Sequence, residues 1–101
     1  MREAIVKVHD LKAGILTKID AQHFRFVYDA GYAGEPVSLT MPIREAAYEF
    51  AIFPPFFDGV LPEGGQLEGL LRYGKIDRFD YFSQLLAVGQ DLVGAVTVFE
   101  K

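Results

Sequence analysis

The order of the predicted elements indicates an α+β domain, in which short helices pack on one side of a mainly antiparallel sheet. Apolar and polar residues alternate in three segments of the first 28 residues, as they do in half-buried strands. Two segments of the second half repeat large apolar residues at i, i+3 and i+4, which is typical of one helix face. A last β-like segment, residues 94–99, is expected to rejoin the sheet.

The N-terminal part predicts a meander of three strands. Residues 3–9, 15–19 and 23–28 alternate between apolar and polar side chains. Residues 10–14 and 20–22 contain the Gly and Asp expected of short turns. Strands joined by such short connections pair antiparallel with their neighbours along the chain.

The next part of the chain is less regular. Residues 29–36 are predicted to form a loop because of their Gly and Pro content. Residues 37–41 predict a short strand that Pro42 ends, and residues 43–47 are long enough for only one helical turn. The pattern of residues 48–53 fits either a strand or a helix.

Three helices are predicted after this point. Pro54 and Pro55 are tolerated in a first helical turn, so a short helix is expected to begin there and to end at Gly59. A second helix is predicted over residues 66–73 and a third up to Gly89. The expected caps are Gly74 after the second helix and Asp77 or Asp80 before the third. The predicted apolar faces contain Leu67, Leu70 and Leu71, and then Phe79, Phe82, Leu85 and Leu86.

Composition limits the function classes. A length of 101 residues fits a single domain, 1–101, that can build one core. Cysteine is absent, the formal net charge is −4, and the ten Lys and Arg residues are not concentrated in one stretch. Direct binding to nucleic acid is therefore not expected, since it requires clustered positive charge. No apolar run is long enough to cross a membrane and no secretory signal is evident, so we expect a cytoplasmic protein.

The titratable residues do not form a pattern typical of catalysis. His9 and His23 each lie at the end of a predicted strand, without carboxylates at the spacing of metal ligands. Neither serine has the surroundings of a nucleophile, and the glycines near residue 65 lack the spacing and the lysine of a phosphate-binding loop. We therefore predict a domain that is not an enzyme and has no catalytic residue, cofactor or metal.

Several motifs in the second half closely resemble the N-terminal subdomain of HipA-type serine/threonine kinases of bacterial toxin–antitoxin systems. The segment around residues 37–42, VSLTMP, is also similar to that family, so the resemblance covers almost the whole chain. The matching residues of the second half are Phe56, Phe57, Asp58, Leu61, Pro62, Glu63, Asp80, Phe82, Leu85, Leu86, Gly89, Asp91, Gly94, Ala95 and Val96.

The resemblance implies a role in binding. In HipA-type kinases a catalytic core follows this subdomain, whereas this sequence stops at Lys101. It is therefore similar to the HipS family, small antitoxins of modules that also contain a HipT kinase and HipB, a helix-turn-helix DNA-binding protein. This resemblance implies an antitoxin that neutralises a HipT-like kinase by direct contact, in a complex with a HipB-like partner. The alternative is the structural N-terminal subdomain of a HipA-type kinase.

The segment FFDGVLPEGG is the predicted partner-binding site. We expect a turn between two helices, held at its base by Phe56, Phe57 and Leu61, whose acidic tip enters or braces a kinase cleft rich in Lys and Mg²⁺. An ordinary helix–helix turn is the alternative. Phe53, Phe56 and Tyr73 are assigned to the core. The predicted site residues are Asp58, Leu61, Pro62, Glu63, Gly64 and Gly65.

Overall fold

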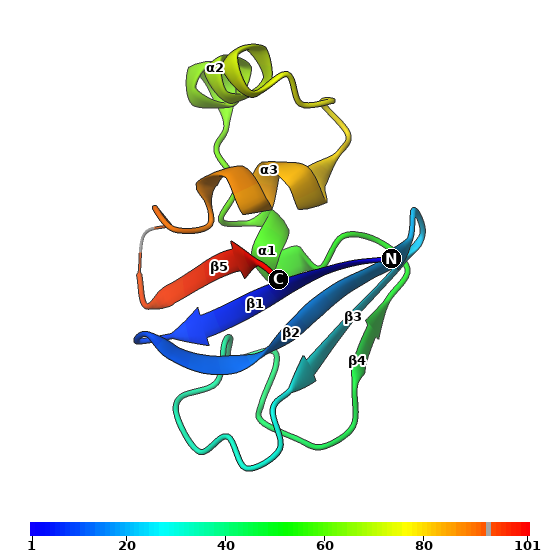
Figure 1. Cartoon of the computed structure of the whole chain (residues 1–101), viewed down its shortest axis with the longest axis vertical. Coiled ribbons are helices and arrows are strands. Elements are labelled where there is room, and N and C mark those ends of the chain that lie inside the picture. The colour runs from blue at the N-terminus through cyan, green and yellow to red at the C-terminus, as the bar shows by residue number, and fades with distance from the viewer. Residues whose placement is uncertain (93) are drawn as a thin grey trace.

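The computed structural model describes residues 1–92 and 94–101, and it confirms the α+β class (Figure 1). A five-stranded antiparallel sheet has the strand order β4-β3-β2-β1-β5. The helices lie on one side of it (Figure 1). The elements are β1 (Arg2–Val8), β2 (Leu11–Asp20), β3 (His23–Tyr28), β4 (Tyr48–Phe50), α1 (Pro55–Asp58), α2 (Gly64–Gly74), α3 (Tyr81–Val88) and β5 (Val96–Glu100).

The predicted meander is present, but its first turn is shorter than expected. β1 ends at Val8 and β2 already begins at Leu11, so only His9 and Asp10 connect them. Both residues have positive φ angles, 50° and 65°, as a two-residue hairpin turn requires. Residues 11–14, predicted to belong to the turn, are the first residues of β2. The register of β1 and β2 shifts between Val6 and Lys7.

Alternation in the strands directs one set of side chains into a single core. Ala4, Val6 and Val8 of β1 are almost completely buried, as are Phe26 of β3 and Val98 of β5. The helical side of the core is supplied by Phe57, Phe82 and Leu85, each no more than 1% exposed. Full burial of a side chain of this size contributes roughly 1.5–3 kcal/mol, so these contacts hold α1 and α3 on the sheet.

The segment between β3 and β4 differs from the prediction. Residues 37–41 form only an isolated bridge between Ser38 and Met41, not a strand. The hydroxyl of Tyr28 accepts a hydrogen bond from the Val37 N–H and donates one to the Met41 carbonyl. These backbone groups are thus satisfied by a side chain instead of a strand neighbour. Residues 43–47 contain no helical turn, and residues 48–50 form β4.

The three predicted helices are present, with different ends. Asp80 caps α3, because its carboxylate accepts a hydrogen bond from the Ser83 N–H at 3.1 Å. The expected cap Asp77 instead accepts from the Phe79 N–H at 2.8 Å, one turn earlier. Gly74 was predicted to follow α2 but belongs to it, and Lys75 takes the left-handed conformation.

The burial of α2 differs most from the prediction. It has no buried residue, and Figure 1 shows it as the element farthest from the sheet. Tyr73, assigned to the core from the sequence, is 86% exposed, and Phe79 before α3 is 75% exposed. Helical spacing correctly predicted the helix, but nothing in the described residues covers it well enough to bury its leucines. Within residues 1–92 and 94–101, no helix has the length and apolar character needed to span a bilayer.

Candidate functional site

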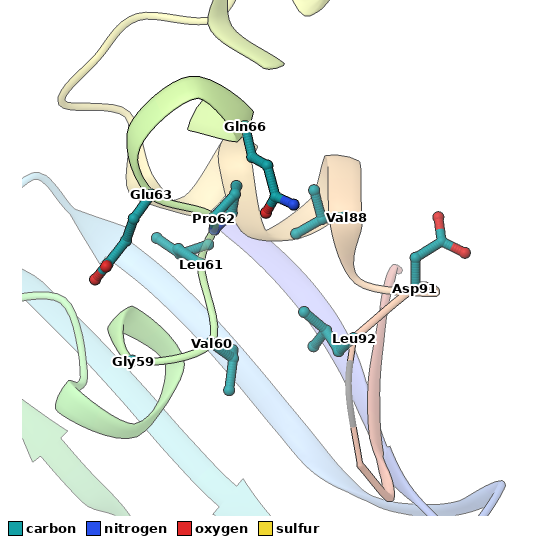
Figure 2. Close-up of a pocket in the computed structure, with 9 residues that line it drawn as sticks. All are labelled: Gly59, Val60, Leu61, Pro62, Glu63, Gln66, Val88, Asp91 and Leu92. Carbon is teal, nitrogen blue, oxygen red and sulfur yellow. The ribbon is translucent and has the colours of Figure 1, made fainter. Parts of the chain in front are cut away.

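The predicted partner-binding segment borders an open hollow of about 510 Å³ between α1, α2 and the end of α3 (Figure 2). Leu61, Pro62 and Glu63 form part of its wall. The other described lining residues are Gly59, Val60, Gln66, Val88, Asp91 and Leu92. The segment therefore connects α1 to α2 and, at the same time, faces the end of α3.

The predicted site residues divide into two groups. Leu61, Pro62 and Glu63 line the hollow, with Leu61 and Pro62 partly buried and Glu63 exposed. Asp58 is the exposed last residue of α1, outside the hollow. Gly64 and Gly65, expected in the turn, are instead the first two residues of α2. The connecting turn is thus shorter than predicted and ends at Glu63.

The base of the segment is anchored in the core. Phe57 is fully buried, and its ring centroid lies 6.3 Å from that of Phe26 in the sheet and 5.2 Å from that of Phe56. Two backbone hydrogen bonds continue from α1 into the turn, from the Val60 N–H to Phe57 and from the Leu61 N–H to Asp58. Leu61 also packs against the core. The turn is therefore held close to the body of the domain, while Glu63 remains in solvent.

Glu63 also begins α2 without satisfying that helix's first N–H groups. It occupies the N-cap position with extended backbone angles, but its side chain makes no capping hydrogen bond. The carboxylate consequently stays available for another partner. A negative charge at this position is favourable, because the N-terminal end of a helix carries a partial positive charge.

Six lining residues are not among the predicted site residues, and two of them, Gly59 and Val60, lie within the predicted segment. Gln66 is in the first turn of α2, whereas Val88, Asp91 and Leu92 come from the end of α3 and the loop after it. Figure 2 shows Gln66 and Val88 on the α3 side of Pro62, with Asp91 and Glu63 on opposite sides of the hollow. To predict that these residues lie near residues 61–63, one must know that α3 ends beside this segment. The available signal was the Gly89 and Asp91 pair in the family motif.

Gly89 allows α3 to end close to the sheet. Its carbonyl accepts a hydrogen bond from the Val98 N–H of β5 at 2.8 Å. A Cβ atom at Gly89 would lie 2.9 Å from both the carbonyl carbon and the Cβ of Val98, and closer still to the carbonyl oxygen. Real Cβ atoms essentially never approach other atoms below 3.0 Å, so a glycine is required here. This contact fixes where Val88 and Asp91 stand relative to the hollow.

The charge of the hollow is acidic. Glu63 and Asp91 are the charged residues among the described lining, and none of that lining is Lys or Arg. The remaining wall is formed by aliphatic side chains, Pro62 and Gln66. Such a surface suits contact with a basic or cation-containing partner rather than with a phosphate group or an acidic peptide.

The histidines have carboxylate neighbours that the sequence did not predict. His9 lies 3.0 Å from Glu35, and His23 lies 2.7 Å from Glu49, each measured from Nε2 to a carboxylate oxygen. The hydrogen bond from His23, together with that from Arg25, holds the pKa of the Glu49 carboxyl below its ordinary value. Both pairs are exposed, and no group of three or more metal-ligating residues occurs in the described part of the chain.

Comparison with known proteins identifies the class of domain. The family described as the HipA N-terminal domain matches residues 4–99, so this chain belongs to that family. The family places the chain in the context of toxin–antitoxin systems, and the matched region of HipA is not its kinase catalytic domain.

A solved structure supports this assignment, and a further protein is similar over most of the chain. A solved structure described as the N-terminal domain of HipA toxin is 28% identical, with a TM-score of 0.79, over 100% of this chain and 93% of that one. An uncharacterised protein of Haemophilus influenzae is 33% identical over 86 residues, which are 85% of this chain and 81% of that protein. The similarity to HipS and to the HipA N-terminal subdomain, inferred from the motifs, is thereby confirmed.

Proposed function

We propose that this protein is an antitoxin that binds a HipT-like serine/threonine kinase and neutralises it by direct, non-covalent contact. The complex also contains a HipB-like helix-turn-helix protein, which supplies the contacts to DNA. The observation that carries the proposal is the acidic, core-anchored segment at Leu61–Glu63, on a chain of the HipA N-terminal domain family. In this proposal residues 1–101 act as one cytoplasmic, non-catalytic binding domain.

The properties of the segment support an inhibitory contact with a kinase. Kinase active sites concentrate positive charge, since a lysine and Mg²⁺ ions hold the phosphates of ATP. Glu63 brings a carboxylate that is exposed and free of a capping hydrogen bond. Because Phe57 and Leu61 hold the base of the turn, little conformational entropy is lost when the turn is bound. In the proposed interface Leu61, Pro62 and Glu63 contact the kinase directly, with Asp58, Gly64 and Gly65 at the margin.

A second function is supported by the match to the N-terminal domain of HipA toxin itself. A domain of this kind can act as a structural part of a kinase, stabilising the catalytic core or its contacts with the HipB-like protein. The two functions predict opposite effects on the activity of a kinase core. An antitoxin added to a kinase core that lacks this domain lowers phosphorylation of the kinase's substrate, whereas a structural subdomain raises it or leaves it unchanged.

The role of the segment is tested with charge reversal at Glu63. Glu63→Lys is expected to weaken binding to the purified kinase by about 2–5 kcal/mol, which is roughly 30- to 4,000-fold in Kd. Glu45→Lys, an equal charge change at an exposed residue of the loop before β4, is the matched control and is expected to bind like the parent. Binding is measured by titration calorimetry and neutralisation by growth on co-expression. If Glu63→Lys folds, binds and rescues growth like the parent, the segment is only a connector.

The absence of direct DNA contact is tested separately. With a net charge of −4 and no basic stretch, the isolated chain is expected not to shift operator DNA at physiological salt. The HipB-like partner is expected to shift the same DNA, and addition of the chain and kinase is expected to retard the complex further. A salt-sensitive shift by the chain alone contradicts this part of the proposal.

A further inference from the structure

An apolar stripe crosses the face of the sheet opposite the helices. The strand register places Ile5 directly opposite Phe99 on one side and Ile15 on the other, and Ile15 opposite Val27. These four residues therefore form a continuous row across β5, β1, β2 and β3, which we call the outer stripe. Each is only partly buried, in contrast to the almost complete burial of the residues on the helical face. In Figure 1 the helices lie above or behind the strands, away from this face.

Charged and polar rows flank the outer stripe on its two sides. On one side, register connects Glu3 to Thr17, Thr17 to Arg25 and Arg25 to Glu49. On the other side, it connects Lys7 to Thr97 and to Lys12. Asp29 completes this second row, because its carboxylate lies 3.6 Å from the Lys12 Nζ and its N–H donates to Ala13 of β2.

On β1 and β3 the charges on the two sides of the stripe are opposite in sign. β1 carries Glu3 on one side of the stripe and Lys7 on the other. β3 carries Arg25 on one side, and Asp29 follows its end on the other. Within the chain, Glu3 is also paired with Lys101 at 3.4 Å and Arg25 with Glu49 at 2.9 Å. A two-fold rotation about an axis along the stripe exchanges the two sides without shifting position along the stripe. It thus brings Glu3 of one copy to Lys7 of the other, and Arg25 to Asp29.

We propose that the outer stripe is a homodimer interface, in which two copies of this chain pack sheet against sheet about that two-fold axis. The stripe of one copy meets the stripe of the other, and four charge pairs of opposite sign surround the contact. Strands of the two sheets run nearly aligned, as in a β-sandwich, where the twist of each sheet sets an angle of about 30°. Closed two-fold dimers with self-complementary surfaces are the commonest oligomers.

The size of the surface indicates how strong the dimer is. Four strand spacings of about 4.8 Å and five residues of about 3.4 Å give a face of roughly 19 by 17 Å. Two such faces bury about 1,000 Å² or less, which is below the standard size of stable interfaces. We therefore expect a reversible dimer whose Kd lies in the micromolar range. The proposed kinase-binding segment is on the helical side of the sheet, so it remains free in both copies.

The test is sedimentation velocity of the parent and of three charge variants, from about 1 µM to about 500 µM, a range that brackets micromolar association. The parent is expected to shift from monomer to dimer. Glu3→Lys and Lys7→Glu each place like charges opposite one another twice, and each is expected to weaken dimerisation at least tenfold. The double variant Glu3→Lys/Lys7→Glu restores opposite signs across the axis and is expected to regain dimerisation. Melting curves establish that each variant is folded.

Three results overturn the proposal. The parent sediments as a monomer at every concentration, the single variants dimerise like the parent, or the double variant remains as weak as the singles. An additional variant, Ile15→Glu, distinguishes a dimer interface from a kinase-binding surface at the outer stripe. If the parent stays monomeric while Ile15→Glu abolishes binding to the kinase, the stripe is a kinase contact and not a dimer interface. Loss of dimerisation with unchanged kinase binding is the result expected here.

Discussion

Gly89 is the residue whose substitution tests the packing of α3 on the sheet most directly. Its backbone angles, φ −59° and ψ −25°, are ordinary for a right-handed helix, so alanine can adopt them without strain. Replacement of glycine by alanine at a compatible position usually stabilises a protein by about 0.4–1 kcal/mol. The expected effect of Gly89→Ala is therefore decided by the space around the residue alone.

There is no space for a Cβ atom at residue 89. The added Cβ would stand 2.9 Å from two atoms of Val98 and nearer still to its carbonyl oxygen, and these are mainly backbone contacts that cannot rotate away. α3 must move outward, which strains the packing of Phe82 and Leu85 and weakens the hydrogen bond from the Val98 N–H to Gly89. Overpacking costs about 1–3 kcal/mol and a lost hydrogen bond about 1 kcal/mol. The sum is about 2–4 kcal/mol.

The assay is thermal unfolding followed by circular dichroism. For a domain of this size the expected cost lowers Tm by roughly 10–25 °C. Gly69→Ala is the matched control, because Gly69 lies within α2 and an added Cβ there meets no atom within 4 Å. It is expected to leave Tm unchanged or to raise it slightly through better helix propensity. If Gly89→Ala melts within about 3 °C of the parent, α3 does not approach β5 as closely as the structure shows.

Three further outcomes follow from the packing and charge. Phe57→Ala is expected to destabilise the fold by about 3–5 kcal/mol in urea titrations, because it leaves a cavity beneath the candidate site. Amide protons of α2 are expected to exchange faster than those of α3, since α2 has no buried residue; equal protection contradicts its weak attachment. Burial raises the pKa of the Asp80 carboxyl, but hydrogen bonds from Ser83 lower the pKa by more in total, so the net shift is downward. Asp80→Ala is thus expected to cost about 1 kcal/mol at neutral pH, and this gap is expected to shrink as the pH falls below the ordinary value of 3.8, where the parent loses the same contribution.

Local patterns in the sequence were sufficient for most of the fold. Alternation predicted β1, β2 and β3 because burial on one face of an antiparallel sheet repeats every second residue. The cap Asp80 and the spacing of Phe82 and Leu85 predicted α3 because both signals are local to one helix. The short α1 followed from its two prolines.

The errors arose where the partner of a segment is distant in the sequence. Residues 37–41 alternate like a strand, but the Tyr28 hydroxyl pairs with the Val37 N–H and the Met41 carbonyl in place of a neighbouring strand. Tyr73, predicted to be a core residue, is 86% exposed, because a sequence pattern within one helix does not say what covers that helix. In the candidate site, Leu61 and Pro62 line the same hollow as Val88, Asp91 and Leu92, an arrangement that no local pattern encodes.

The two proposed surfaces lie on opposite faces of one sheet, and this separation makes them independent tests. The core that separates them contains Phe26 and Leu16, both fully buried, so a change of charge on one face does not reach the other. Substitutions at distant sites with no shared neighbour have additive effects. Glu63→Lys is therefore expected to weaken kinase binding and leave the dimer intact, while Glu3→Lys is expected to do the reverse. A dimer with two free kinase-binding segments would also hold a kinase that is itself presented in pairs more tightly than either copy alone, because the second contact forms within the same complex. For the monomeric variant, the affinity for a single kinase domain should then remain that of the parent, and only the affinity for a paired kinase should fall.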